Sequence, residues 1–263
     1  MSEGSYQDLL FEKKDHVVTI TLNRPKVYNA FRGRTCAELV QAFGRAGYDK
    51  DVGVIVLTGA GEKAFCTGGD QSGHDGQYEG DRGIVGMPID EVHSVIRDVP
   101  KPVLAKVRGY AIGGGNVLAA ICDLTVAADT AIFGQVGPKM GSVDPGFGTA
   151  YLARVVGEKK AREIWYLCRR YSAQEAQEMG LVNHVVPEAQ LDAEVDAWCA
   201  EIVQRSPTAI ALAKRSFNAD TESIRGIGGL GMLGLSLYYG TEESKEGVAA
   251  LQEKRDPDFR SRL

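Results

Sequence analysis

Two glycine-rich segments of the chain could bring backbone amides against a ligand. Ala64–Gln71 (AFCTGGDQ) follows an apolar run, and Gly109–Asn116 (GYAIGGGN) lies between an apolar run and a helical pattern. Glycine has no side chain, so its backbone can approach a ligand closely, and a helix start adds unpaired N–H groups and a positive dipole end. Two such amides on one oxygen would form an oxyanion hole, where each donor is worth roughly 3–4 kcal/mol. Either segment alone is better explained by a tight turn.

Asp144 is the candidate acid–base group. It lies in the segment Phe133–Gly148 (FGQVGPKMGSVDPGFG). A carboxylate can act as a general base, particularly where burial raises its pKa. The alternative is a structural role, because Asp-Pro-Gly is ordinary turn chemistry, and Asp144 taken in isolation fits that role better.

Alternating strand and helix patterns must position these segments. Short β-branched or apolar runs predict strands, and apolar residues three and four apart predict helices. The predicted strands cover residues 17–22, 52–57, 103–107, 124–127 and 182–186, and the predicted helices between them cover 35–48, about 89–96 and 116–122. This alternation predicts an α/β core.

Only helices are predicted from about residue 191 onward. Ser206 followed by Pro207 predicts a helix start there, and Ser172 with Glu175 predicts a capping box for an earlier helix. We therefore expect residues 1–200 to form the core that carries the site and residues 201–263 to form a helical region. The glycine-rich stretch Gly226–Gly234 within that region should be bent or mobile.

The composition argues against several classes of protein. The 263 residues are 44% hydrophobic and 25% charged, as in ordinary globular proteins. A net charge of -5 argues against nucleic acid as a partner, because nucleic-acid binders usually carry a basic face. The five cysteines lack disulfide or metal-ligand spacing, and neither a signal-peptide pattern nor an apolar stretch of ~18 residues is present. The sequence thus predicts a cytoplasmic protein with no metal and no membrane partner.

Five segments, in order, resemble the crotonase superfamily over nearly the whole chain. They are the three segments above together with Thr241–Gly247 (TEESKEG) and Glu253–Phe259 (EKRDPDF). The resemblance implies a crotonase-like spiral of ββα units, followed by C-terminal helices that build a homotrimer, commonly paired into a homohexamer. It also implies an acyl-CoA substrate and no cofactor beyond the CoA of that substrate. The N–H groups of Gly69 and Gly114 would hold the thioester oxygen.

The chain departs from the hydratases of that superfamily at two positions. The hydratases use two glutamates, and the matching residues here are Val117 and Gly137, neither of which can carry a proton. Hydration of an enoyl-CoA by the usual pair is therefore not expected. Within this frame Asp144 becomes the expected base, rather than a turn residue.

The segment FGQVGPKMGSVD is similar to a branch with two related activities, 2-ketocyclohexanecarboxyl-CoA hydrolase and 1,4-dihydroxy-2-naphthoyl-CoA synthase. Asp144-Pro145-Gly146 stands where the synthase has Asp-Gly-Gly, and the stretch Gln71–Tyr78 lacks the synthase's longer basic insertion. The resemblance is therefore closest to the hydrolase. It implies hydrolytic opening of a cyclic β-keto-acyl-CoA to a dicarboxylic acid mono-CoA thioester such as pimeloyl-CoA, in anaerobic degradation of aromatic or alicyclic acids. Ring closure by the synthase is the alternative.

We expect Asp144, oriented by Ser142, to activate water, and Tyr239 or the protonated Asp144 to protonate the carbon. Whether Tyr239 serves its own subunit or a neighbour stays open, as do the ring size and a bicarbonate-like anion near Gly137. Tyr78 is a single aromatic in a polar loop, and Lys254 could equally be a solvated surface lysine. The expected substrate-binding residues are Thr67, Gly68, Asp70, Gln71, Tyr78, Tyr110, Gly113, Gln135, Gly137 and Lys254.

Three other hypotheses fit the sequence less well. Gly59–Ala64 (GAGEKA) fits a loose dinucleotide-binding fingerprint, but Phe65–Gly69 stands where the helix should begin. Ser72, His74 and Asp75 lie too close together in one loop to form a catalytic triad. A non-catalytic RNA-binding member of the superfamily would need a basic stripe, and the chain has none.

Overall fold

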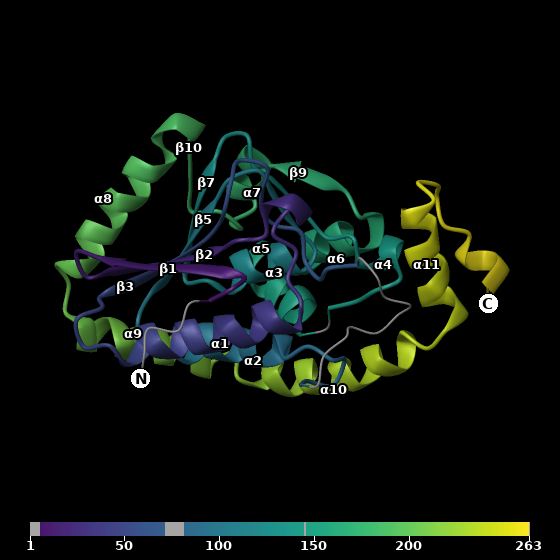
Figure 1. Cartoon of the computed structure of the whole chain (residues 1–263), viewed down its shortest axis with the longest axis horizontal. Coiled ribbons are helices and arrows are strands. Elements are labelled where there is room, and N and C mark those ends of the chain that lie inside the picture. The colour runs from purple at the N-terminus through teal and green to yellow at the C-terminus, as the bar shows by residue number, and fades with distance from the viewer. Residues whose placement is uncertain (1–5, 72–81, 145, 263) are drawn as a thin grey trace.

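The computed structural model describes residues 6–71, 82–144 and 146–262. Tyr78, with Ser72, His74 and Asp75, lies outside the described residues. Two β-sheets and a set of surrounding helices make up the fold (Figure 1).

The larger sheet has six strands in the order β1-β2-β3-β5-β7-β10. Only β1 and β2 pair antiparallel, and the other neighbours are parallel. β3 is buried along nearly its whole length, as expected for a parallel strand covered on both faces. The bounds are Leu9–Lys14 for β1, Val17–Leu22 for β2, Val54–Gly59 for β3, Val103–Val107 for β5, Leu124–Ala128 for β7 and His184–Val186 for β10.

The smaller sheet brings the glycine segments together. Its four strands, in the order β4-β6-β8-β9, are β4 (Ala64–Cys66), β6 (Tyr110–Ile112), β8 (Ile132–Gly134) and β9 (Arg170–Ser172). β4, β6 and β8 are parallel neighbours, so their carboxyl ends meet at one edge, where open α/β sheets usually bind ligands. Each strand has only three residues, too few for a period-two pattern, which is why the sequence did not predict them.

Helices cover both faces of the larger sheet. α1 (Gly33–Tyr48), α2 (Ile89–Asp98) and α3 (Gly114–Ile121) pack on the main core. α8 (Leu191–Val203) covers the opposite face through Leu191, Val195 and Cys199. The capping box of α7 (Ala173–Glu178) is confirmed, because Ser172 and Glu175 exchange hydrogen bonds. The remaining short elements are η1 (Pro25–Val27), α4 (Gly137–Met140), the π-helical turn η2 (Phe147–Tyr151), α5 (Leu152–Val156), α6 (Glu158–Leu167) and η3 (Glu188–Gln190).

The C-terminal region is helical, as predicted. α9 (Pro207–Ala219) begins at Ser206, whose hydroxyl accepts a hydrogen bond from the Ala209 N–H. α10 (Ser223–Tyr238) runs along the molecule below α2, and α11 (Glu242–Gln252) and the short η4 (Phe259–Arg262) lie at the far end (Figure 1).

The glycine-rich stretch that we expected to be bent or mobile is regular helix within α10. The buried residues of α10, which are Ile224, Met232 and Leu235, recur on one face of that helix. Packing of this face stabilises the helix more than its glycines destabilise it. Over the described residues, no helix combines the length and the apolar content needed to cross a membrane.

Candidate active site

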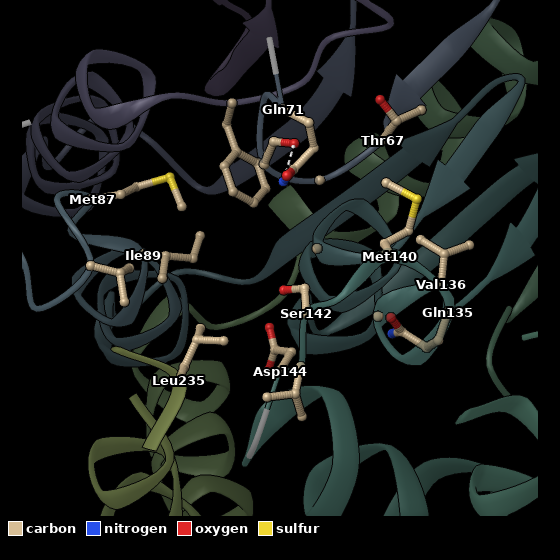
Figure 2. A pocket seen from close by; sticks show the side chains of 18 of the residues that line it. Thr67, Gln71, Met87, Ile89, Gln135, Val136, Met140, Ser142, Asp144 and Leu235 are labelled. Carbon is tan, nitrogen blue, oxygen red and sulfur yellow. Dashed lines mark hydrogen bonds between the residues drawn. The ribbon is translucent and has the colours of Figure 1, made fainter. Parts of the chain in front are cut away.

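A cavity of about 110 Å³ opens at the carboxyl ends of β4, β6 and β8. Figure 2 shows the side chains of Ser142 and Asp144 pointing into the same space, with Ile89 and Leu235 on one side and Val136 and Met140 on the other. The lining combines glycines, a few polar groups and an apolar wall. Its residues are Phe31, Thr67, Gly68, Gly69, Gln71, Val85, Met87, Ile89, Gly113, Gly114, Gln135, Val136, Gly137, Met140, Ser142, Val143, Asp144, Trp165, Met232, Leu235 and Tyr239.

The turn after β4 directs the Gly69 N–H away from the neighbouring segment of the chain, which contains Phe31. Phe31 donates its N–H to the Gly68 carbonyl at 2.8 Å and accepts the Asp70 N–H at 2.8 Å. These two bonds form a parallel bridge between Phe31 and Gly69. In such a bridge the N–H of the bridged residue points to the other side, so the Gly69 amide faces away from Phe31, and Gly69 lines the cavity.

The second glycine turn lies directly against the first. A Cβ on Gly68 would be 2.9 Å from the Gly114 nitrogen, and Gly68 has a φ of 88° that favours glycine. Gly114 is the first residue of α3, where amide groups have no intrahelical acceptor. The structure therefore brings both predicted amide donors to one cavity, in contact with each other's turns.

Asp144 is a partly buried carboxyl group that lines the same cavity. Loss of surrounding water raises its pKa from 3.8 to about 7, although the Gly148 N–H, which donates to Oδ1 at 3.0 Å, acts to lower it. A Cβ on Gly148 would lie 2.9 Å from the Asp144 carboxyl group, so only glycine leaves room for this contact. Asp144 is thus poised to exchange a proton near neutral pH.

Ser142 and Tyr239 form a hydrogen-bonded pair beside Asp144. The Ser142 hydroxyl and the Tyr239 hydroxyl are 3.0 Å apart, and the Tyr239 side chain is buried. Tyr239 caps the end of α10, so within one chain the C-terminal region reaches the site formed by the core. Within a single chain, Tyr239 lines the same cavity as Asp144.

The two positions that match the hydratase glutamates hold Val117 and Gly137, and neither has a carboxylate. Val117 is fully buried in α3. A side chain at Gly137 would lie 2.6 Å from the Ser142 carbonyl and 2.7 Å from the Trp165 ring. Among the described residues that line the cavity, Asp144 is the one carboxylate. No group of three or more potential metal ligands occurs in the part of the chain that the structure describes.

Most of the predicted substrate-binding residues line this cavity, and three do not. Asp70 forms an ion pair with Arg24 at 2.7 Å, and the Tyr110 ring packs against Tyr28 and under Arg170. Lys254 lies in a separate groove of about 460 Å³, which shares Met140 with the cavity. Binding roles for these three residues, and for Tyr78, stay predictions. The predicted residues that do line the cavity are Thr67, Gly68, Gln71, Gly113, Gln135 and Gly137.

The sequence did not predict the apolar wall of the cavity. Ile89 of α2 and Met232 and Leu235 of α10 belong to ordinary amphipathic patterns, which predict burial but not a ligand. Phe31 lies in a turn, and its role depends on the bridge to Gly69. These side chains share one cavity with Asp144 because the turn at Phe31, α2 and α10 pack together in the folded chain.

Comparison with known proteins agrees with the fold. The chain is similar to an enoyl-CoA hydratase from Mycobacterium avium subsp. paratuberculosis K-10, with 30% identity, a TM-score of 0.87 and coverage of 97% of this chain and 99% of that one. An enoyl-CoA hydratase from Bacillus anthracis gives 32% identity and a TM-score of 0.74, with coverage of 96% and 98%. An enoyl-CoA hydratase/isomerase from Pseudoalteromonas atlantica T6c, at 24% identity, shares the fold, with a TM-score of 0.85 and coverage of 96% and 100%.

The ββα units, the C-terminal helices and these neighbours define a crotonase fold. The sequence profile for enoyl-CoA hydratase/isomerase matches residues 12–262, and the chain belongs to that family. It is therefore a crotonase-family enzyme that processes acyl-CoA.

Proposed function

We propose that this enzyme opens the ring of a cyclic β-keto-acyl-CoA by hydrolysis, as in the conversion of 2-ketocyclohexane-1-carboxyl-CoA to pimeloyl-CoA. The observation that carries the proposal is the carboxylate of Asp144, the one carboxylate among the described residues that line the cavity. Its pKa is raised to about 7, and it shares that cavity with the Gly69 and Gly114 turns. Addition of water to a double bond by the usual pair needs a second carboxylate, and Val117 and Gly137 cannot supply it.

In the first step Asp144 removes a proton from water, and the resulting hydroxide adds to the ring ketone. A carboxylate with a pKa near neutrality is well matched to this proton transfer. The Ser142 hydroxyl, fixed by Tyr239 at 3.0 Å, would orient Asp144 and the attacking water. The product of this step is a tetrahedral alkoxide on the former ketone carbon.

In the second step the alkoxide collapses to a carboxylic acid. The bond between that carbon and the α-carbon breaks, and its electron pair passes into the thioester as an enolate. The Gly69 and Gly114 amides would stabilise the enolate oxygen. A proton from Asp144 or from the Tyr239 hydroxyl then reaches the α-carbon, so the balance is one water consumed per ring opened.

The lining supports an alicyclic acyl group. Val85, Met87, Ile89, Met232 and Leu235 provide an apolar wall without a charged group, which suits a saturated ring and leaves its ketone to face the polar side. The neighbouring groove that contains Lys139 and Lys254 supports a place for the CoA phosphates, because lysine pairs readily with phosphate.

An assembly of three or six copies is part of the proposal. α9 and α10 expose Leu212, Phe217, Leu230 and Leu237 to more than two thirds of their possible extent. Large exposed apolar side chains on adjacent helices are typical of an interface. Sedimentation of the purified protein at several concentrations measures the assembly directly.

Mass spectrometry of the product tests the reaction. The purified enzyme is incubated separately with 2-ketocyclohexanecarboxyl-CoA and with succinylbenzoyl-CoA. The hydrolase adds one water to the first substrate, whereas a 1,4-dihydroxy-2-naphthoyl-CoA synthase removes one water from the second. Turnover of the second substrate alone would refute ring opening, and crotonyl-CoA serves as the control for residual hydratase activity.

A further inference from the structure

Arg97 of α2 is a buried cation outside the cavity. Only 4% of its surface is exposed, and its Nη2 donates to the Thr221 hydroxyl at 2.5 Å. Its Nε has no hydrogen-bond partner among the described residues. Among the described residues no carboxylate pairs with Arg97, and a buried charge without one costs stability that an apolar side chain of the same size would not cost. The contacts of its guanidinium with aromatic rings offset part of that cost.

Those contacts are with the π-helical turn η2. The Arg97 guanidinium lies 4.7 Å from the centre of the Tyr151 ring and 5.3 Å from that of Phe147. A cation held over aromatic faces is attracted to both rings, and more strongly where water is excluded. The ring of His93, one turn earlier on α2, stands nearly perpendicular to the Phe147 ring with 5.5 Å between the ring centres. Burial lowers the pKa of His93 to about 4, so it is neutral at pH 7.

The same arginine also joins the C-terminal helices. Its side chain meets Thr221, just before α10, and its carbonyl accepts the Asn218 amide of α9 at 2.7 Å. α2 and α10 supply Ile89, Met232 and Leu235 to the cavity, and η2 contains Gly148, which donates its N–H to Asp144. Arg97 thus links the elements that surround Asp144 without touching the cavity itself. π-helical turns often occur at functional sites, where they depart from regular helix geometry.

We propose that Arg97 is a positioning residue that fixes η2 through its contacts with the aromatic rings of Phe147 and Tyr151, and so holds the Gly148 N–H on Asp144. This rests on the proposed role of Asp144 as the base. The geometry of the turn, rather than the charge of Arg97 at the reacting atoms, is what reaches the site.

The test compares Arg97→Met, which keeps the bulk and removes the cation, with Arg97→Lys, which keeps a cation over the rings. Arg225→Met is the matched control, because Arg225 ties α10 to α2 through Asp98 at 2.6 Å and forms no hydrogen bond, ion pair or ring contact with η2 in the described structure. Hydrogen exchange of the peptide over 146–152 is measured in each full-length protein, without substrate. kcat, KM and the pH dependence of kcat/KM are then measured on the cyclic substrate.

The backbone amides of η2 should exchange hydrogen at least ~10-fold faster in Arg97→Met than in the wild type, whereas their exchange rates should be unchanged in Arg225→Met. Loss of the Gly148 hydrogen bond removes a group that stabilises the carboxylate, so the rise of kcat/KM with pH should move up by about one unit. kcat should fall roughly 10-fold with KM nearly constant, and Arg97→Lys should recover most of both changes.

Arg97→Met behaving as Arg225→Met, with a lower melting temperature but unchanged exchange and pH profile, would overturn the proposal. Should Arg97→Met not fold, Thr221→Val removes only the hydroxyl partner and is judged by the same two measurements. A wild-type enzyme that turns over neither CoA ester defeats the proposed function, whereas the exchange experiment still decides whether Arg97 holds η2.

Discussion

Replacing Asp144 with asparagine removes the proposed base while keeping its shape. The asparagine Oδ1 can still accept the Gly148 N–H that lies 3.0 Å from the aspartate oxygen, so the turn should be retained. Asparagine cannot take a proton from water, and a general base contributes typically 10²–10⁴-fold to the rate. We expect kcat for ring opening to fall by about 10³-fold, with KM changed by less than ~3-fold because the cavity walls are intact.

The same substitution should stabilise the fold at high pH. Asp144 has a pKa of about 7 in the folded protein against 3.8 for an ordinary aspartate, so the folded state binds this proton more tightly than the unfolded state. Its contribution to stability therefore falls as pH rises from 3.8 to about 7 and is constant above that. The difference between a pKa of 3.8 and one of about 7 corresponds to at most about 4 kcal/mol, by which the free energy of unfolding of Asp144→Asn should exceed that of the wild type above pH 7.

Two measurements check these expectations. Ring opening is followed by the appearance of the water-adduct mass, and urea unfolding is compared at pH 5 and pH 8. Asp196→Asn, on the exposed face of α8, is the control for loss of one negative charge. Near-normal turnover in Asp144→Asn would refute the base assignment, and equal stability gains at both pH values would refute the raised pKa.

Three further predictions follow from the site. In the wild type, kcat/KM for ring opening should rise with pH through a single step near pH 7, the value for Asp144, and a pH–rate profile checks this. Gly115→Ala should lower both the melting temperature and kcat, because its Cβ would lie 2.0 Å from the Cys66 carbonyl, whereas Gly44→Ala in α1 meets nothing within 4 Å and should stabilise by about 1 kcal/mol in thermal unfolding. Tyr239→Phe should lower kcat at least ~10-fold in a steady-state assay, because Ser142 loses its hydroxyl partner; unchanged kinetics would exclude tyrosine from proton transfer and orientation.

The sequence predicted the α/β core and the helical C-terminal region because their patterns are long. Residues 103–107 were assigned as a strand with the bounds that the structure shows, and Ser206 was identified as a helix cap. The three-residue strands β4, β6 and β8 carry too little pattern to be predicted, yet they bring the glycine segments together. Regular helix over Gly226–Gly234 depends on tertiary packing, which local propensity does not contain.

The site residues also fall into two groups, those that lie in recognisable sequence segments and those that reach the cavity only through tertiary packing. Gly69, Gly114 and Asp144 lie in segments that, taken singly, fit ordinary turns. The ordered resemblance of those segments to the crotonase superfamily predicted a shared site, and the three residues line one cavity. Phe31, Met87 and Leu235 are ordinary apolar residues, and their presence at the cavity depends on contacts between distant parts of the chain.

The raised pKa of Asp144 connects the C-terminal helices to the chemistry. A carboxylate open to water would keep a pKa near 3.8 and would be too weak a base to activate water efficiently at neutral pH. The wall that removes water from the site includes Met232, Leu235 and Tyr239, all from the α10 region. In the described fold the core thus supplies the carboxylate and the amides, and the packing of α10 creates the desolvated setting in which that carboxylate can act as a base.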